Sequence, residues 1–428
     1  MTEKHNVLIF PAETGIGLEI FDSLRYKRNL RLLGATSVTH TSYADFLYQK
    51  VHRLPFVTEK GFLDDLNTLI EHEEIEYVFP CHDDVCLALS NMRNSINAKV
   101  IGQSYEINSI VRYKSRTYEA LEGHIQVPEI RCLHDGDCRF PVFCKPDKGS
   151  GSRGTYLIEQ RSEIDNILSN IDPNKYVFIE NLPGDEFTID CFSNVVGLMF
   201  CGGRTRSKTM GGMSTISKTE NRPIFREMAE AIQRVLPMRG AWFFQVKEDQ
   251  NGAVKLMEVA PRIAGTMCLY RMLGVNFSEL SILEADCVPL EVQAHNIYAE
   301  VSRTLPFGQV YSFSERFGDL YVDLDDTLIL DESRVNTELV GLIHHWRNTN
   351  RKTHLVTRHV HNPIETLSSF RLDNLFDEVY HLRDEPKSQF VPAGSVLLDD
   401  SYRERSDCSQ NGAYGFAPDA IPFLMCSD

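Results

Sequence analysis

Long hydrophobic runs are missing from this chain of 428 residues, and no stretch of about 18 apolar residues is available to span a membrane. The first residues lead directly into a short apolar run, without the hydrophobic region of a signal peptide, so we expect a cytoplasmic protein. Cations are also scarce, because 44 Lys and Arg stand against 60 Asp and Glu, for a net charge of -16. That charge opposes binding to phosphate backbones or anionic lipid, so the sequence predicts no nucleic-acid partner and no membrane partner.

Clustered cysteines are missing as well. The 11 cysteines are scattered, none forms a C-x-x-C pair, and most lie in apolar stretches. Neither a zinc site nor a disulfide framework is therefore expected. With 42% hydrophobic and 24% charged residues, the composition is that of a globular protein, and the length favours two to four domains.

The N-terminal region has the pattern of a parallel α/β layer. An apolar run at residues 7–10 is followed by a turn at 11–17 and an amphipathic stretch at 18–25, which predicts strand, turn and helix. Gly15 and Gly17 could line a phosphate loop, but without a third glycine a structural turn is favoured. We expect a Rossmann-like domain over residues 1–110.

A second domain is expected over residues 111–305. An apolar strand that bears Lys145 runs into a loop rich in glycine and serine at 149–154. Such a loop lets backbone N–H groups approach phosphate oxygens, although its spacing is not that of a P-loop and a flexible surface loop is the alternative. Gln245 and Glu258 lie on two apolar strands joined by a turn at 249–252. Across that hairpin both side chains could bind one Mg²⁺, which prefers oxygen ligands.

Arg262 follows Glu258 by four positions in the sequence. Together with the features above, it makes residues 5–300 resemble the ATP-grasp superfamily, in particular the ligases similar to the large subunit of carbamoyl phosphate synthetase. The resemblance implies ATP and Mg²⁺ as cofactors, with Gln245 and Glu258 as magnesium ligands and Arg262 at the acyl-phosphate. It also implies a set of ATP-binding residues: Lys114, Lys145, Gly149, Ser150, Gly151, Ser152, Arg153, Gly154, Glu180, Leu182 and Glu186.

Two features of this half leave questions open. The family commonly has Asn two residues after the metal-binding glutamate, and Ala260 stands there, so a second magnesium is in doubt. Arg204, Arg206 and Lys208 lie on what reads as a glycine-ended loop beside the cleft. We expect them to bind an anionic acceptor substrate, with a solvated loop as the equal alternative.

A third domain is expected over residues 319–428, after a linker around 305–308. Asp323 and Asp325 follow an apolar strand, and further strands end in Thr357 and in Asp399 and Asp400, with Lys387 between them. In a parallel sheet these strand ends meet at one edge. A carboxylate there can attack phosphorus if a magnesium ion screens the neighbouring charges.

This set resembles the haloacid dehalogenase-like phosphatases. The resemblance implies Asp323 as nucleophile, Asp325 as acid and base, Thr357 and Lys387 as phosphoryl binders, and a magnesium site made by Asp323, Asp325, Asp399 and Asp400. The short gaps between the motifs leave no room for a large cap domain. The expected fold class is therefore α/β: a Rossmann-like layer, an ATP-grasp α+β fold, and a doubly wound parallel sheet.

Together the two halves predict a bifunctional enzyme. Its ligase would join small carboxylate and amine substrates, possibly phosphorylated, and its phosphatase would act on a related metabolite, possibly within a homodimer. The alternatives are a phosphatase whose ATP-grasp half only binds or senses nucleotide, and a nucleotide sensor without catalysis.

Overall fold

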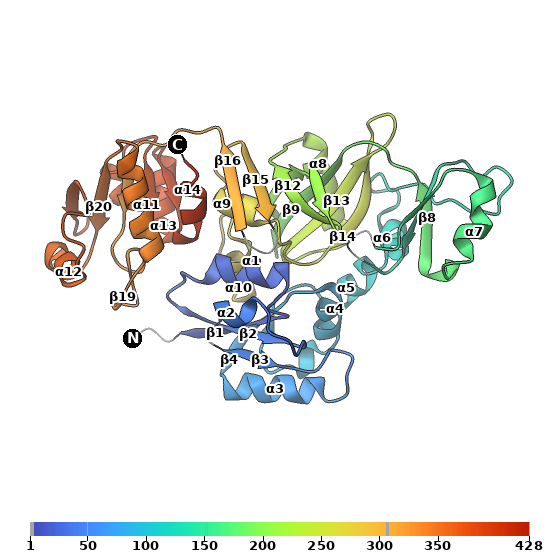
Figure 1. Ribbon diagram of the computed structural model, residues 1–428, viewed down its shortest axis with the longest axis horizontal. Helices are drawn as coiled ribbons and strands as arrows, with labels where there is room; N and C mark the ends of the chain where they lie inside the picture. Colours follow the sequence, from blue (N-terminus) through green and yellow to red (C-terminus); the bar gives the residue numbers. More distant parts are fainter. Residues whose placement is uncertain (1–3, 49, 150, 152, 305–307, 428) are drawn as a thin grey trace.

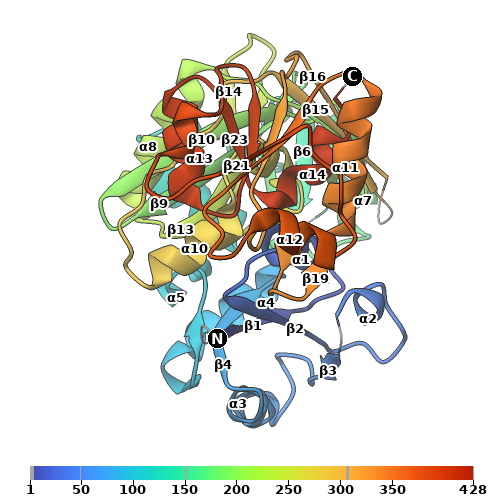
Figure 2. The ribbon, with the colours of Figure 1, turned by 90° about the vertical axis from the view of Figure 1, so that its left-hand side faces the viewer.

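The computed structural model describes residues 4–48, 50–149, 151, 153–304 and 308–427. Three units follow one another along the chain (Figure 1). The N-terminal layer lies beneath the middle unit, and the C-terminal unit packs beside both. Seen from the C-terminal side, the last unit covers much of the middle unit and stands above the N-terminal sheet (Figure 2).

The N-terminal unit is a parallel sheet of order β3-β2-β1-β4-β5. Alternate residues of β1 face opposite sides, so Val7 and Ile9 pack towards α1 while Leu8 and Phe10 pack towards α3 and α4. The expected strand, turn and helix at the start of the chain are confirmed. The elements are β1 (His5–Phe10), α1 (Gly15–Leu24), β2 (Leu30–Thr36), α2 (Ala44–Leu47), β3 (Val51–Arg53), α3 (Phe62–His72), β4 (Ile75–Pro80), α4 (Asp83–Asn91) and β5 (Lys99–Val100).

The middle unit contains three antiparallel sheets, of order β7-β6-β8, β10-β9-β13-β14 and β11-β12-β15-β16. Helix α8 packs on one face of the second sheet and α10 on the other. The helices are α5 (Tyr105–Val111), α6 (Lys114–Leu121), α7 (Ile164–Leu168), α8 (Pro223–Val235), α9 (Cys268–Met272) and α10 (Phe277–Ala285). The strands are β6 (Val142–Pro146), β7 (Tyr156–Ile158), β8 (Tyr176–Glu180), β9 (Glu186–Asn194), β10 (Gly197–Thr205), β11 (Lys208–Met210), β12 (Met213–Lys218), β13 (Gly240–Glu248), β14 (Val254–Ala260), β15 (Ala299–Thr304) and β16 (Gly308–Phe313).

The C-terminal unit is a parallel sheet of order β21-β20-β17-β22-β23 with a short hairpin, β18-β19. The strand order reverses between β17 and β22, and function in such sheets concentrates at that point. The elements are β17 (Leu320–Val322), β18 (Ile329–Leu330), β19 (Arg334–Val335), α11 (Thr337–Asn348), β20 (Thr353–Thr357), α12 (Pro363–Ser369), β21 (Glu378–His381), β22 (Val396–Leu398), α13 (Tyr402–Gln410), β23 (Tyr414–Phe416) and α14 (Ile421–Leu424).

The three units share a buried core and a buried ion-pair network. Arg271 of α9, whose side chain is 3% exposed, pairs with Glu19 of α1 at 2.6 Å and with Asp419 of the C-terminal unit at 3.1 Å. The sequence predicted a linker around residues 305–308. Gly308 instead begins β16 and pairs with Thr304 of β15. Residues 305–307 lie outside the described chain. Hydrogen bonds between β15 and β16 make β16 part of the third sheet of the middle unit. The connection to the last sheet is therefore formed by residues 314–319.

Candidate active sites

A cleft with a volume of about 230 Å³ lies between the β6 sheet and the β13-β14 hairpin. Cations and carboxylates from both sides face it, which suits a ligand that carries phosphates and a metal ion. Many of the expected ATP-site residues line it: Lys114, Lys145, Gly149, Gly151, Arg153, Glu180, Leu182, Glu186, Gln245 and Glu258. Ser150 and Ser152 of the expected phosphate loop lie outside the described residues, and Gly154 follows Arg153 with φ +69°.

Among the cations that line the cleft, Lys145 is the buried one. Its side chain is buried, and its Nζ donates to the hydroxyl of Tyr118 at 2.6 Å and to the carbonyl of Met257 at 3.2 Å. Burial first, and then the charge of Lys114, lower the pKa of Lys145 to about 7, although Glu258 opposes the shift. Both of its hydrogen-bond partners are uncharged, so neither forms an ion pair with the ammonium group. An anion that enters the cleft could therefore pair with Lys145.

Gln245 and Glu258 are directly opposite each other across the β13-β14 hairpin. Cross-strand partners have their side chains on the same face, so an amide oxygen and a carboxylate point into the cleft together. Ala260 lies one pleat further along β14 and is buried, and it has no oxygen in its side chain to contribute. The hairpin therefore offers two oxygen-bearing side chains at this position, which fits one divalent cation that completes its shell with phosphate or water.

Two further carboxylates stand along the rim of the cleft. Glu180 ends β8, where its carboxylate accepts from the backbone N–H of Glu129 at 2.7 Å and pairs with Lys255 at 2.6 Å. Glu186 begins β9 and pairs with Arg206 at 2.6 Å. Groups of the protein therefore hold both side chains in place, and no ligand is needed to orient them.

The expected acceptor-binding cations do not lie on one loop, which corrects the sequence-based expectation. Arg204 belongs to β10, is 1% exposed, and pairs with the fully buried Asp190 at 2.8 Å, so it has no access to the cleft. Lys208 is exposed on β11. Of the three, Arg206 lines the cleft, and its Nη2 donates to the carbonyl of Gly212 at 2.7 Å. Arg204 lies within β10, whereas Arg206 follows the end of that strand at Thr205, so the alternation along β10 does not set the direction of Arg206.

The glycine loop after β6 touches the β11-β12 turn. A Cβ atom on Gly212 would lie 2.3 Å from the Cα of Gly151, and both residues have positive φ, +76° and +70°. This close approach of two backbones requires glycine on both sides.

Arg262 lies in a smaller pocket that adjoins the cleft and shares Lys114, Gly149 and Glu258 with it. Its guanidinium is held by Asp83 at the start of α4, with Nη2 to Oδ2 at 3.1 Å. The next residue, Asp84, pairs with Lys148 at 2.8 Å. The N-terminal unit thus supplies two carboxylates, Asp83 and Asp84, that the sequence analysis did not identify. The sequence feature that could have indicated them is an acidic pair shortly after a buried strand.

The C-terminal unit brings three carboxylates together at the carboxyl ends of β17 and β22. Oxygens of Asp323, Asp399 and Asp400 lie within 4.8 Å of one another. Nζ of Lys387 is 2.7 Å from Asp323 and 2.7 Å from Asp399. Burial and then Asp399 raise the pKa of Asp323 to about 8 against the opposing effect of Lys387. Burial and then Asp399 also raise the pKa of Asp400 to about 6. One lysine leaves this group electrostatically unsatisfied, so the donor set suits a divalent cation.

Asp325 differs from its expected place among the metal ligands. Its carboxylate lies outside this cluster and faces His359, with Nδ1 2.8 Å from Oδ1. Thr357 is fully buried at the end of β20, and its Oγ1 accepts from the backbone N–H of His359 at 3.1 Å. Because successive residues after a strand need not share a direction, the D-x-D spacing alone could not fix where the second carboxylate points.

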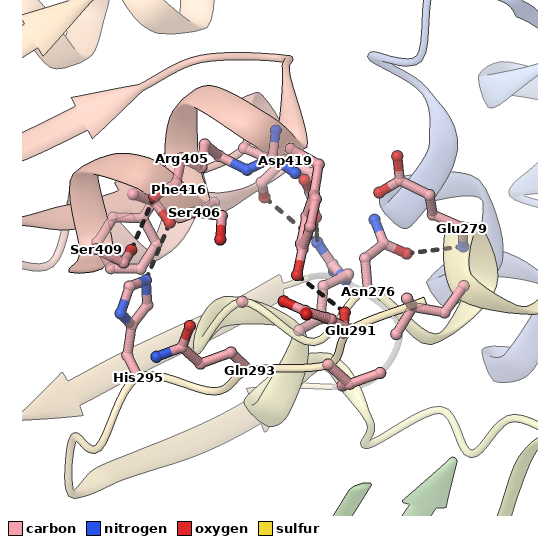
Figure 3. Close-up of a pocket in the computed structure, with 18 of the residues that line it drawn as sticks. Asn276, Glu279, Glu291, Gln293, His295, Arg405, Ser406, Ser409, Phe416 and Asp419 are labelled. Atoms are coloured by element: carbon pink, nitrogen blue, oxygen red, sulfur yellow. Dashed lines mark hydrogen bonds and ion pairs between the residues drawn. The ribbon is translucent and has the colours of Figure 1, made fainter. Parts of the chain in front are cut away.

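A third pocket lies on the seam between α10 with residues 291–295 and α13 with β23 (Figure 3). Three of its charged side chains are paired: Arg271 with Asp419, and Glu279 with Lys27. Arg405 crosses from this seam to the carboxylate cluster, where its Nη1 donates to the carbonyls of Asp399 at 2.8 Å and Asp400 at 2.6 Å. The seam therefore supports the backbone that carries two of the three carboxylates.

Comparisons with known proteins find matches to part of this chain. Residues 172–303 match the family model described as ATP-grasp in the biosynthetic pathway with Ter operon. No curated protein matches the chain. Among the described residues, no helix is long and apolar enough to cross a membrane.

Several solved structures are similar over about 70% of the chain. The biotin carboxylase domain of the 2-oxoglutarate carboxylase of Hydrogenobacter thermophilus, a dimer with MgADP, ADP and bicarbonate, has a TM-score of 0.59 at 13% identity, covering 71% of this chain and 75% of that one. The biotin carboxylase of Campylobacter jejuni has a TM-score of 0.59 at 15% identity, covering 71% and 76%. The L-amino acid ligase of Bacillus licheniformis has a TM-score of 0.56 at 15% identity, covering 71% and 80%.

Proposed function

We propose that this chain, which has the ATP-grasp fold, is an ATP- and Mg²⁺-dependent ligase that joins a carboxylate to an amine through an acyl-phosphate. The observation that carries the proposal is the cleft that combines the buried Lys145 and the half-buried Lys114 with the opposed pair Gln245 and Glu258. A carboxylate is a poor electrophile until phosphorylation gives it a leaving group, and the site needs mainly cations to stabilise the transferring phosphoryl group. The similarity to an L-amino acid ligase and to biotin carboxylases supports the same reaction class.

The proposal assigns a binding role to each of the main residues that line the cleft. Lys114 and Lys145 would bind the phosphates, and the glycine loop after β6 would cover them against water. Gln245 and Glu258 would hold Mg²⁺, which screens the charge of the phosphates when bound. Arg262, fixed by Asp83, would bind the acyl-phosphate end of the site. The adenine is assigned to the edge at Glu180 and Leu182, and the ribose to Glu186.

The test is ADP release from Mg-ATP in the presence of pooled carboxylic acids and amino acids. We expect release that depends on the acid, and we expect Glu258→Ala to abolish it. Glu227→Ala, which removes an exposed carboxylate on α8 of the same unit, serves as the matched control. ATP binding without acid-dependent ADP release would instead favour an ATP-grasp half that only binds or senses nucleotide.

A second function is favoured by the carboxylate cluster of the C-terminal unit. We propose that this unit is a haloacid dehalogenase-like phosphatase, in which Asp323 attacks phosphorus while Lys387 and Thr357 hold the phosphoryl oxygens. Asp399 and Asp400, with Asp323, would hold Mg²⁺, whose charge reduces the repulsion between nucleophile and phosphate. We expect Mg²⁺-dependent hydrolysis of a generic phosphate ester that Asp323→Asn abolishes and Glu258→Ala leaves intact. Hydrolysis that survives in Asp323→Asn would refute this assignment.

We further propose that the two activities act on related small metabolites. Separately, Arg28 joins the N-terminal unit to the proposed phosphatase site, because its Nη1 lies 2.8 Å from Asp326, which directly follows Asp325. Arg28→Ala should then lower ester hydrolysis several-fold and leave ADP release unchanged, whereas Arg226→Ala on exposed α8 should change neither. Equal effects of both substitutions would argue against a role for the N-terminal unit at this site. A homodimer, like that of the Hydrogenobacter domain, completes the proposal and is tested by light scattering.

A further inference from the structure

The pocket on the seam between the middle and C-terminal units has no part in either proposed function (Figure 3). Its volume is about 80 Å³, and it lies between α10 with residues 291–295 and α13 with β23. Glu291, Gln293 and Tyr402 are exposed, so the pocket opens to solvent beside them. A cavity of about 150 Å³ can hold benzene, so this smaller pocket, open at one side, suits about three to five non-hydrogen atoms.

Arg405 is a buried cation of this pocket. It is 9% exposed, and its Nη1 donates to the carbonyls of Asp399 at 2.8 Å and Asp400 at 2.6 Å. Among the described residues, no carboxylate forms an ion pair with Arg405, whereas Arg271, the other guanidinium of the pocket, pairs with two. A buried guanidinium without a counter-charge is costly, and the carboxylate of a ligand would supply that charge.

Glu291 offers the opposite charge at the mouth of the pocket. No described cation pairs with its carboxylate, and its backbone carbonyl accepts from the Tyr402 hydroxyl at 2.9 Å. Arg405 and Glu291 line the same pocket and form no ion pair with each other, so a gap separates the two charges. The other two carboxylates of the pocket are already paired with a lysine and an arginine. The described lining therefore presents one unpaired positive charge and one unpaired negative charge.

We propose that the seam pocket binds a small α-amino acid as a zwitterion, with its carboxylate at Arg405 and its ammonium group at Glu291. A zwitterion supplies both counter-charges at once. A simple anion would face the three carboxylates that line the pocket, and a simple cation would leave Arg405 unpaired.

The bound amino acid would also act on the carboxylate cluster, because Arg405 holds the backbone of Asp399 and Asp400. An occupied pocket fixes the guanidinium and, through it, the two carbonyls. We therefore expect the amino acid to strengthen Mg²⁺ binding at the cluster. This link rests on the proposed phosphatase site, whereas the binding of the amino acid does not.

Calorimetry on the full chain with glycine, acetate and methylammonium tests the site. Glycine should bind, and acetate and methylammonium, which each carry one of the two charges, should bind at least about 10-fold more weakly. Glu291→Gln should weaken glycine binding by about 10-fold or more, whereas Glu227→Gln, which changes an exposed carboxylate of α8, should leave it unchanged. Ser406→Phe, which fills the pocket from α13, should abolish glycine binding.

The link to the metal site has a readout of its own. Coupling between two binding sites is reciprocal, so Mg²⁺ should tighten glycine binding by the same factor by which glycine tightens Mg²⁺ binding, and we expect about 5-fold. Asp323→Asn should remove this effect of Mg²⁺ and leave glycine binding without Mg²⁺ intact.

The outcomes separate the pocket from the function beside it. Acetate that binds as tightly as glycine, or glycine binding that survives in both Glu291→Gln and Ser406→Phe, would overturn the assignment of the pocket. Glycine binding that Mg²⁺ does not change would overturn the link to the metal site. If ester hydrolysis survived in Asp323→Asn, the phosphatase would fall, and the glycine measurements without Mg²⁺ would still decide on the pocket. Thermal melting identifies a variant that has unfolded, and the comparison of the three probes on the parent protein depends on no variant.

Discussion

Replacing Lys387 by Met should reveal how the carboxylate cluster is held. The ammonium is 3% exposed and lies 2.7 Å from each of Asp323 and Asp399. At an effective dielectric constant of about 20, each contact corresponds to about 6 kcal/mol of attraction, which is partly offset by the cost of burying the charges. Removal of one partner from a buried ion pair usually costs about 3–5 kcal/mol, and we expect a loss of that size in the absence of divalent cations.

The pH dependence of the loss has a defined sign. The pKa of Asp323 is already raised to about 8 by burial and by Asp399, and Lys387 is the cation that opposes this rise. A carboxyl group whose pKa is raised by folding binds its proton more tightly in the native state, so stability falls as the pH rises from the unfolded pKa of about 4 towards the native value. Without Lys387 the native pKa rises further, so this fall extends to higher pH, and the variant should lose more stability at about pH 8 than at about pH 6.

Hydrogen exchange followed by mass spectrometry can measure this loss locally, in the peptides that contain β17 and β22. Lys352→Met is the matched control, because this exposed lysine lies in the same unit, and it should change stability by less than about 0.5 kcal/mol. Added Mg²⁺ should restore much of the protection in Lys387→Met. A loss below about 1 kcal/mol without divalent cations, or a loss that does not grow with pH, would refute the reasoning.

Three further predictions follow from the charged groups. Because burial and Lys114 lower the pKa of Lys145 to about 7, ATP binding should take up as much as about one proton at about pH 8, which calorimetry in buffers of different ionisation enthalpy measures. Because Asp323 binds protons with a pKa of about 8, Mg²⁺ should raise Tm more at about pH 8.5 than at about pH 6, and an equal shift would argue against a metal site there. Arg204→Met should cost about 3–5 kcal/mol of unfolding free energy by leaving Asp190 buried and unpaired, whereas the additional change Asp190→Leu should recover most of it; denaturant unfolding of both variants decides.

The local patterns predicted most of the fold, and many of the residues they singled out line one cleft. Alternating apolar residues and the turn at 249–252 were enough to place Gln245 and Glu258 opposite each other, because the register of a hairpin is set by its turn and its hydrophobic face. The carboxylates Asp323, Asp399 and Asp400 could be placed at one sheet edge for a similar reason, since parallel strands share the direction of their carboxyl ends.

Side-chain direction outside regular pairing could not be predicted in this way. Arg204 and Arg206 are two residues apart, yet Arg204 turns into the core towards Asp190 while Arg206 faces the cleft. The strand ends between them, so the alternation that holds within β10 does not extend to its exit. Asp325 was likewise expected with the metal ligands, but the loop after β20 brings His359 to it.

By itself, the sequence determined which residue types stand at the strand ends and loops where phosphate and metal chemistry is possible, because these positions depend on local periodicity and turn chemistry. The tertiary structure alone decided which of them meet. Asp83 reaches Arg262 from a different unit, Arg28 reaches Asp326, and Arg271 joins all three units. Such contacts join residues about 150 to 300 positions apart and depend on how whole layers pack, and this packing is set by the shared apolar core rather than by any local pattern.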